Sequence, residues 1–296
     1  IDELGYEVNP IARNLRKGSS QIVGLVVSNL ANYFYTDLAA GVESILRPAG
    51  YDTHIINSNE SLEREKRNVR DLALQSADGI ILAPTGNDCS YLQDTTFQNQ
   101  PFVFVDRKPR RAGHDSVMST NFKGSYEAVN HLLSKGHARI GFIASRSNET
   151  MMERLSGYTQ ALSDSGIASE EELVLMGQDE PKTLKNLLRA ERYSQLQEYL
   201  ETARPSAIFL GNGLAAVGVF QYLRDNGIRV PKDIALLSFD DEFWYQMSTP
   251  QISAVAQDPY QIGVVAAERL LKRMRGGTGK YRTIRIKTRL ILRESC

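Results

Sequence analysis

Apolar runs alternate with amphipathic segments along most of the chain. The apolar runs are continuous and rich in Val, Ile, Leu and Phe, a pattern typical of strands buried on both faces of a parallel sheet. Predicted strands lie at residues 22–27, 53–56, 79–83, 102–105, 140–143, 173–176, 207–210 and 234–239. Helical spacing of apolar residues predicts helices near residues 34–46, 62–76 and 124–133. Repeated strand–helix units predict an α/β fold built from doubly wound parallel sheets.

The predicted strands fall into two groups. Roughly ten strands are more than one sheet of this type holds comfortably, and the alternation breaks at residues 109–115, a basic stretch that contains glycine. We therefore expect two α/β lobes. In open parallel sheets, ligands bind beyond the carboxyl ends of the strands, so the candidate binding residues are those that follow each strand.

Residues 1–20 follow neither pattern. Asn9-Pro10 is a favourable helix start, with an N-cap residue followed by proline at the first helical position. The next segment can form about two helical turns, which are marginal in water by themselves. It carries Leu15 and three basic residues, Arg13, Arg16 and Lys17. Such a helix suits a DNA minor groove, where a leucine can part a base step; the alternative is a flexible linker whose charges are incidental.

Composition narrows the classes of function. The chain has 296 residues, with 35 Lys and Arg against 35 Asp and Glu, so a nucleic-acid contact would have to come from a local patch. Its cysteines, Cys89 and Cys296, can form no disulfide framework or zinc site, which indicates a reducing compartment such as the cytoplasm. No apolar run has the ~20 residues needed to cross a membrane, and no signal peptide is recognised. The first residues are similar to the end of a helix, so we expect a further segment before them.

Several short motifs stand in a characteristic order. The first are Leu4-Gly5-Tyr6, Asn9-Pro10 and Ala12-Arg13-Asn14-Leu15. Further along come Ile22-Val23-Gly24-Leu25-Val26, Val105-Asp106-Arg107, Gly136-His137-Ala138-Arg139-Ile140-Gly141-Phe142-Ile143 and Phe239-Asp240-Asp241. Together, over essentially the whole chain, these motifs resemble the lactose/galactose repressor (LacI/GalR) family of bacterial transcription regulators.

The resemblance implies an organisation that composition does not show. The lobes would resemble type I periplasmic sugar-binding proteins, with the chain crossing back and forth between them. Residues 21–121 and 257–281 would form an N-terminal effector-binding lobe, and residues 122–256 and 282–296 a C-terminal one. Residues 1–20 would hold the end of a helix-turn-helix DNA-binding domain and a hinge helix. A homodimer would place two hinge helices on a palindromic operator.

The resemblance also implies ligand contacts. A small effector would bind in the cleft between the lobes and control operator binding through the hinge helices. The effector-binding residues would be Tyr33, Phe34, Thr85, Arg107, Thr150, Arg154, Asp179, Asn212, Asp240, Trp244 and Gln257. The hinge-helix residues that contact DNA would be Ala12, Leu15 and Arg16. Carboxylate and guanidinium groups suit sugar hydroxyls, since the first accepts and the second donates hydrogen bonds.

Purely structural roles are open for several of these residues. Asp240 can serve as a helix N-cap, and Arg154 as a partner in a salt bridge between the lobes. Arg107 can serve merely as a partner of Asp106 or Asp240. The aromatic residues after the first strand can simply cover the end of the sheet.

Departures from the family pattern concern the charge of the pocket. The family's usual Asn-Asp pair is here Asn212-Gly213, and Thr120 stands where an aspartate is frequent. Because Arg107 and Arg154 are retained, the loss of two acids would make the pocket more positive. We therefore expect an anionic effector, such as a sugar acid or a phosphorylated sugar, rather than a neutral sugar.

The resulting hypothesis is an effector-responsive repressor of carbohydrate or sugar-acid metabolism, with no cofactor, metal or enzymatic activity. An alternative with the same fold is a solute-binding protein for a sugar transporter, which needs a signal peptide and has no use for residues 9–17. An enzyme would need a convergent nucleophile, base and oxyanion site, and we can assemble none. Residues 269–293 hold ten basic residues and no acid, but residues 282–287 alternate, as in the solvated face of an edge strand.

Overall fold

The chain divides into two compact units. The computed structural model describes residues 19–109, 113–144, 148–177 and 190–296. Unit 1 comprises residues 1–30, 34–118 and 259–284, and unit 2 comprises residues 31–33, 119–258 and 285–296. The expected boundaries were 121/122, 256/257 and 281/282, whereas the chain changes unit at 118/119, 258/259 and 284/285. The short segment 31–33, which follows the first strand, groups with unit 2.

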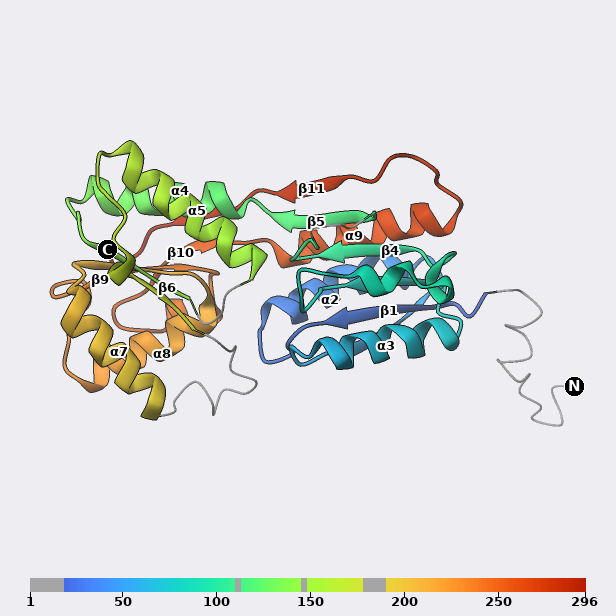
Figure 1. Cartoon of the computed structure of the whole chain (residues 1–296), viewed down its shortest axis with the longest axis horizontal. Helices are drawn as coiled ribbons and strands as arrows, with labels where there is room; N and C mark the ends of the chain where they lie inside the picture. Colours follow the sequence, from blue (N-terminus) through green and yellow to red (C-terminus); the bar gives the residue numbers. More distant parts are fainter. Residues whose placement is uncertain (1–18, 110–112, 145–147, 178–189) are drawn as a thin grey trace, which may run out of the picture. The chain divides into compact units, whose positions relative to one another are not determined.

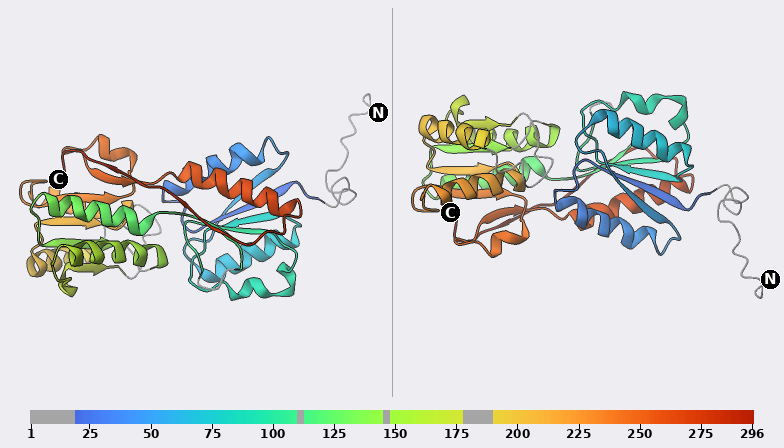
Figure 2. Two further views of the ribbon diagram at one scale, coloured as in Figure 1. Left: turned by 90° about the horizontal axis from the view of Figure 1, so that it is seen from above. Right: turned by 90° about the horizontal axis from the view of Figure 1, so that it is seen from below.

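Unit 1 is built on a six-stranded sheet with helices on both faces (Figures 1 and 2). Its strands, in spatial order, are β11 (Thr283–Ile286), β5 (Asp115–Ser119), β4 (Phe102–Val105), β3 (Gly79–Leu82), β1 (Ile22–Val27) and β2 (Asp52–Asn57). The pairs from β2 to β5 are parallel, with Ile22 opposite Asp52 at the start of β1. The helices are α2 (Phe34–Leu46), α3 (Leu62–Leu74) and α9 (Pro259–Met274).

Unit 2 repeats this topology. Its strands, in spatial order, are β12 (Arg289–Ile291), β10 (Ser253–Ala256), β9 (Ala235–Phe239), β8 (Ala207–Leu210), β6 (Ile140–Ala144) and β7 (Val174–Met176). Its helices are α4 (Asn121–Ser134), α5 (Glu149–Asp164), α7 (Ala190–Ala203) and α8 (Gly213–Asp225). Edge strand β12 runs antiparallel to β10, so the sheet is not wholly parallel as the apolar pattern predicted. The α/β class and the periplasmic-binding-protein-like architecture are confirmed.

The central strands β6 and β8 of unit 2 are apolar throughout because each face of the sheet is covered. On one face, Phe142 and Phe209 pack with Tyr158 of α5. On the other, Ile208 and Leu236 pack in a second cluster with side chains of α7 and α8. Burial of both faces removes apolar surface from water on each side of the sheet, which is why the strands show no alternation of apolar and polar residues.

The basic run at residues 269–293 contributes edge strands and ion pairs to the fold. It contains β11 and β12, and each lies at a sheet edge, which confirms the edge-strand prediction. Several of its arginines form ion pairs with acidic residues of the same unit: Arg269 and Arg273 with Asp115, Arg285 with Glu153, and Arg293 with Asp241. Nor does any described helix have the length and apolarity needed to span a membrane.

Close packing of α2 against α9 depends on glycine. A Cβ atom at Gly263 would overlap the backbone carbonyl oxygen of Leu38, and one at Gly41 would overlap that of Tyr260. We expect Gly263→Ala to lower the free energy of unfolding by about 1–3 kcal/mol, because backbone must move to admit the methyl group. Urea denaturation measures the effect. Gly279→Ala is the control, since a Cβ there meets nothing within 4 Å; equal midpoints for both variants would contradict the close approach.

Candidate functional site

Polar side chains gather where β8 and β9 of unit 2 end. Arg154 extends from α5, and only 2% of its surface is exposed. Its Nε donates to Oδ1 of Asn121 at 3.0 Å, and its Nη1 donates to the carbonyl oxygen of Gly211 at 2.7 Å. The guanidinium carbon lies 3.6 Å from the centre of the Phe239 ring. A buried charge requires partners of this kind, and here they hold the guanidinium at the carboxyl edge of the sheet.

Asp240 is the second charged residue at this edge. It follows β9 with φ at 75°, a left-handed conformation that is uncommon for residues other than glycine. Its Oδ2 accepts the backbone N–H of Gly213 at 3.1 Å and lies 3.9 Å from Nη1 of Arg154. Its Oδ1 accepts a hydrogen bond from Nε2 of Gln257 at 2.5 Å. Strained backbone of this kind is found preferentially at functional sites, which supports a binding role for Asp240.

The same backbone feature occurs at the equivalent position of unit 1. Strands β4 and β9 both stand third from the edge of their sheets, and Asp106, which follows β4, has φ at 64°. The hydroxyl of Tyr35 donates to Oδ2 of Asp106 at 2.8 Å. Each sheet therefore presents an aspartate, on strained backbone, at its carboxyl edge.

The start of α8 also belongs to the cluster in unit 2. Asn212 is the N-cap residue, and its Oδ1 accepts the backbone N–H of Ala215 at 3.0 Å. It is 5% exposed. Thr150 is buried on α5, one helical turn before Arg154. Of the predicted effector-binding residues, the structure thus brings Arg154, Asn212, Asp240 and Gln257 to one place, with Thr150 on the same helix face as Arg154.

Arg107 of unit 1 is engaged in an internal ion pair. Its Nη1 and Nη2 donate to the two carboxylate oxygens of Glu60 at 3.0 and 2.8 Å, and its Nε lies 3.4 Å from Asp106. It is only 7% exposed. The expectation that Arg107 pairs with Asp106 holds, whereas Glu60 is a partner that the sequence did not indicate. A ligand that took this guanidinium from Glu60 would have to replace two charge-assisted hydrogen bonds.

Thr85 is held in a hydrogen-bond network of unit 1. Its backbone N–H donates to the carboxylate of Glu65, and its hydroxyl lies 3.0 Å from that of Ser58. Burial raises the pKa of Glu65 above its usual range, although Thr85 and Tyr91 both donate hydrogen bonds to it. These contacts fix Thr85 just beyond the carboxyl end of β3.

The predicted aromatic residues belong to different units. Phe34 is buried in the first turn of α2 in unit 1. Tyr33, which groups with unit 2, is 48% exposed and meets the ring of Phe243 edge-on, with centroids 5.2 Å apart. Trp244 packs on Phe220 of α8. Phe34 therefore packs in unit 1, whereas the ring contacts of Tyr33 and Trp244 are within unit 2.

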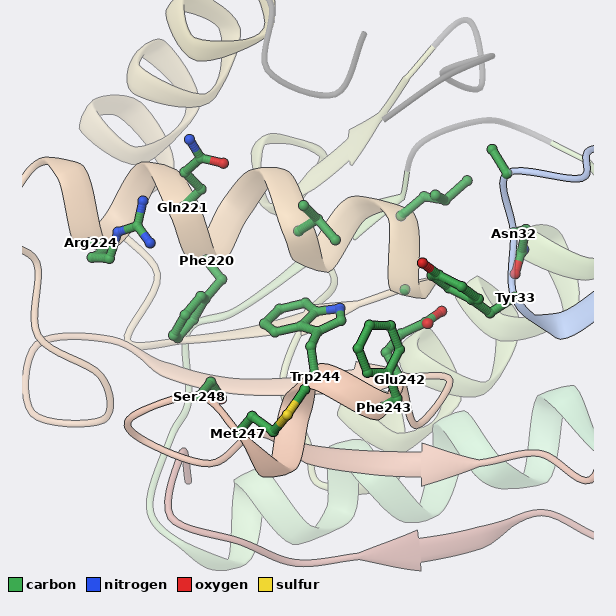
Figure 3. A pocket seen from close by; sticks show the side chains of 14 residues that line it. Asn32, Tyr33, Phe220, Gln221, Arg224, Glu242, Phe243, Trp244, Met247 and Ser248 are labelled. Carbon is green, nitrogen blue, oxygen red and sulfur yellow. The ribbon is translucent and has the colours of Figure 1, made fainter. Parts of the chain in front are cut away.

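Tyr33 and Trp244 instead line a groove beside α8, which we call the α8–η5 groove (Figure 3). Its volume is about 450 Å³, and its walls come from α8, the short helix η5 (Phe243–Gln246) and the segment 31–33. Most of the side chains along it are apolar, including Leu214, Val217 and Met247. Trp244 therefore belongs to an apolar surface, where its ring packs on those of Phe220 and Tyr245.

Some predicted residues lie outside the described part of the chain, namely Ala12, Leu15, Arg16 and Asp179. Conversely, sequence reasoning missed Asn121, which positions Arg154, and Glu242, which lies against Gly213. The sequence does contain a signal for Glu242. Helix α8 begins with a glycine, and an acidic residue follows shortly after β9, the next strand of the chain. Over the described residues, no group of three or more His, Cys, Asp and Glu side chains is placed to hold a metal ion.

Comparison with known proteins gives a consistent result. Residues 129–296 match the model of the periplasmic binding protein-like domain. Over 297 residues the chain is 30% identical to the HTH-type transcriptional regulator KdgR of Bacillus subtilis, covering all of this chain and 86% of that protein. Over 302 residues it is 26% identical to the HTH-type transcriptional repressor PurR of Vibrio atlanticus, covering 87% of that protein.

Solved structures of regulators have the same fold. The complex of transcriptional regulator CelR with cellobiose has a TM-score of 0.83 and 27% identity, covering 98% of this chain and 92% of that one. A LacI-family regulator from Enterococcus faecium with bound ribose has a TM-score of 0.78 and 25% identity, covering 93% of this chain and 98% of that one. The chain therefore belongs to the LacI/GalR family of transcription regulators and has a periplasmic-binding-protein-like effector domain.

Proposed function

We propose that this chain binds a carbohydrate-type effector through the polar cluster of unit 2, and that binding controls its affinity for operator DNA in the cytoplasm. The observation that carries the proposal is the meeting of Arg154, Asn212, Asp240 and Gln257 at the carboxyl edge of one sheet. Together they offer a cation, a carboxylate and two amides. A ligand with several hydroxyl groups, each both donor and acceptor, complements such a set.

The relatives support this class of ligand. One regulator of the same fold was solved with cellobiose and another with ribose. The relatives are transcription regulators, which favours regulation over solute capture for a transporter. Thr85 and Arg107 of unit 1 stay predicted effector contacts. Ala12, Leu15 and Arg16 stay predicted DNA contacts in the hinge helix.

A thermal-shift panel tests the proposal. The panel holds D-ribose, cellobiose, D-gluconate, glucose 6-phosphate and hypoxanthine. A compound that binds only the folded state, at about a hundredfold excess over its Kd, stabilises it by about 2.7 kcal/mol. We expect a sugar of the panel to raise the melting temperature of the wild type by about 5 °C or more, and to have little effect on Asp240→Asn. Asp225→Asn, at the exposed end of α8, is the control and should respond like the wild type. A response to hypoxanthine alone would overturn the carbohydrate class.

We further propose that the chain forms a homodimer in which a second copy packs on the exposed apolar part of the α8–η5 groove, at Phe243 and Met247. Met247 and Phe243 are 70% and 58% exposed there, next to Trp244 and Phe220. Contiguous exposed apolar surface of this kind commonly marks an interface between proteins. A two-fold operator needs a two-fold protein, so a second copy is the occupant that the function requires.

Met247→Glu tests this interface by placing a charge on the exposed part of the groove. We expect the wild type to sediment as a dimer, and the variant to dissociate at concentrations about tenfold higher or more, since a charge buried at an interface is strongly unfavourable. Leu292→Glu is the matched control, because Leu292 is a 52% exposed apolar residue of unit 2 that does not line the groove. If Met247→Glu remains as dimeric as Leu292→Glu, another surface forms the dimer.

A further inference from the structure

Gly213, the first residue of α8, is in contact with the side chain of Glu242. A Cβ atom at position 213 would lie 2.7 Å from Cγ and 2.8 Å from Cδ of Glu242, and would overlap its Oε1. Distances this short do not occur between real side chains. The carboxylate of Glu242 therefore occupies the space that any residue other than glycine would fill. Figure 3 shows this side chain pointing toward the start of α8.

The surroundings of Glu242 are those of the polar cluster. Asp240 accepts the backbone N–H of Gly213, and Asn212 caps the same helix. Two carboxylates thus lie at the N-terminal end of α8, where the partial positive charge of the helix favours anions. Glu242 is partly exposed and, with Gly213, lines one end of the α8–η5 groove. Because Glu242 lies against Gly213, whose backbone N–H donates to Asp240, its carboxylate is next to the polar cluster.

We propose that Glu242 determines effector specificity: its carboxylate accepts hydrogen bonds from effector hydroxyl groups, and glycine at position 213 leaves room for it. The inference rests on the proposed function, because it assigns one more contact to the same ligand. The family's usual aspartate at position 213 is absent from this chain. The carboxylate of Glu242 takes its place at the start of α8.

This assignment changes the expected charge of the effector. The expectation of an anionic effector assumed that glycine at position 213 removes a carboxylate from the cluster. In unit 2, Asp240 lies 3.9 Å from the guanidinium of Arg154, and Glu242 brings a second carboxylate to the start of α8, beside Gly213. A carboxylate or phosphate of the ligand would be repelled at this end of α8. The ligand group placed there is a donor, a hydroxyl in a sugar.

Three variants separate binding by Glu242 from a structural role. Glu242→Gln keeps the shape of the side chain and removes its charge. Gly213→Ala keeps the charge and displaces the carboxylate. Gly213→Asp combined with Glu242→Ala restores a carboxylate from the other side, at a helix position where aspartate is favoured. Exposed Glu198→Gln on α7 is the control. Titration calorimetry with D-ribose and cellobiose measures Kd, and thermal melts without ligand measure stability.

We expect each single variant to raise the Kd of the sugar that the wild type binds by about tenfold or more, as expected for loss of a hydrogen bond to a charged group. The double variant should return to within about threefold of the wild type. We expect the melting temperatures without ligand not to follow the Kd values. If Glu242 had only a structural role, an aspartate at position 213 would not restore binding. If Glu242→Gln and Gly213→Ala bind as the wild type does while Asp240→Asn fails, the role of Glu242 is wrong and the proposed function stands. If the wild type binds only D-gluconate or glucose 6-phosphate, the role of Glu242 is wrong and the proposed function stands. If it binds no carbohydrate of the panel, both are overturned.

Discussion

Arg154→Ala should weaken binding of the effector sugar by about a hundredfold, the largest functional effect of any single change in the cluster. The side chain is 2% exposed and links Asn121, the carbonyl of Gly211 and the ring of Phe239. Its loss removes a charged donor from the ligand and leaves buried acceptors unpaired, and each such deficit costs about 1–3 kcal/mol. Titration calorimetry with the panel sugar that binds the wild type measures the change in Kd.

Arg154→Lys separates charge from geometry. Lysine keeps the charge but cannot reproduce the planar fork that reaches both Asn121 and Gly211. We expect the Kd of Arg154→Lys for the sugar to remain at least about tenfold higher than that of the wild type. A Kd for Arg154→Ala within threefold of the wild type would show that Arg154 only supports the fold, and the effector site would have to be sought elsewhere.

Asp115→Asn should lower the free energy of unfolding by about 3 kcal/mol, the largest effect expected on stability. Asp115 is fully buried, and it accepts hydrogen bonds from Arg269 and Arg273 at 2.7 Å each and from the backbone N–H of Arg282 at 2.8 Å. The arginine side chains are themselves only 17% and 11% exposed. Removing one partner of a buried ion pair typically costs about 3–5 kcal/mol. Urea denaturation measures the change, with Asp225→Asn as the exposed control.

The stability that Asp115 contributes should depend on pH. Burial would raise the pKa of its carboxyl, but hydrogen bonds from Arg273 and Arg269 outweigh burial and lower the pKa below the usual value. A carboxyl whose pKa is lowered in the folded state stabilises the protein above its unfolded pKa of about 3.9 and loses that contribution as the pH falls further. The difference between wild type and Asp115→Asn should therefore be constant from neutral pH down to about pH 5 and narrow below about pH 4. A difference that is unchanged at low pH would show that the charge of Asp115 is not the cause.

The regular elements could be predicted from the sequence because their signals are local. The first strand is Ile22–Val27 and the first helix of unit 1 is Phe34–Leu46, as the apolar periodicity predicted. Strand β5 (Asp115–Ser119) was not predicted, because Asp115 and two serines interrupt its apolar pattern. Its polar residues are buried by partners from distant parts of the chain, such as Arg269, and no local pattern reveals such partners.

The candidate site divides in the same way. Asp240 and Arg107 could be located because each lies within two residues of the end of a strand, where the fold places ligand-binding residues. The pairing of Arg107 with Glu60 joins residues 47 positions apart, and its existence depends on the loop after β2. The contact of Glu242 with Gly213 likewise depends on how η5 approaches α8. A count of acids, position by position along the sequence, does not include such a contact.

The measurement that tests the account most directly is the affinity of the protein for DNA with and without effector. Duplexes that the protein selects from a random-sequence library serve as operator, and fluorescence anisotropy gives the Kd with and without the panel sugar that stabilises the wild type. Coupling between two sites typically amounts to about 5–150-fold, so we expect the sugar to change the Kd for DNA by at least about fivefold in the wild type and not in Asp240→Asn. A sugar that binds the protein tightly and leaves the affinity for DNA unchanged would contradict control of operator binding by this site.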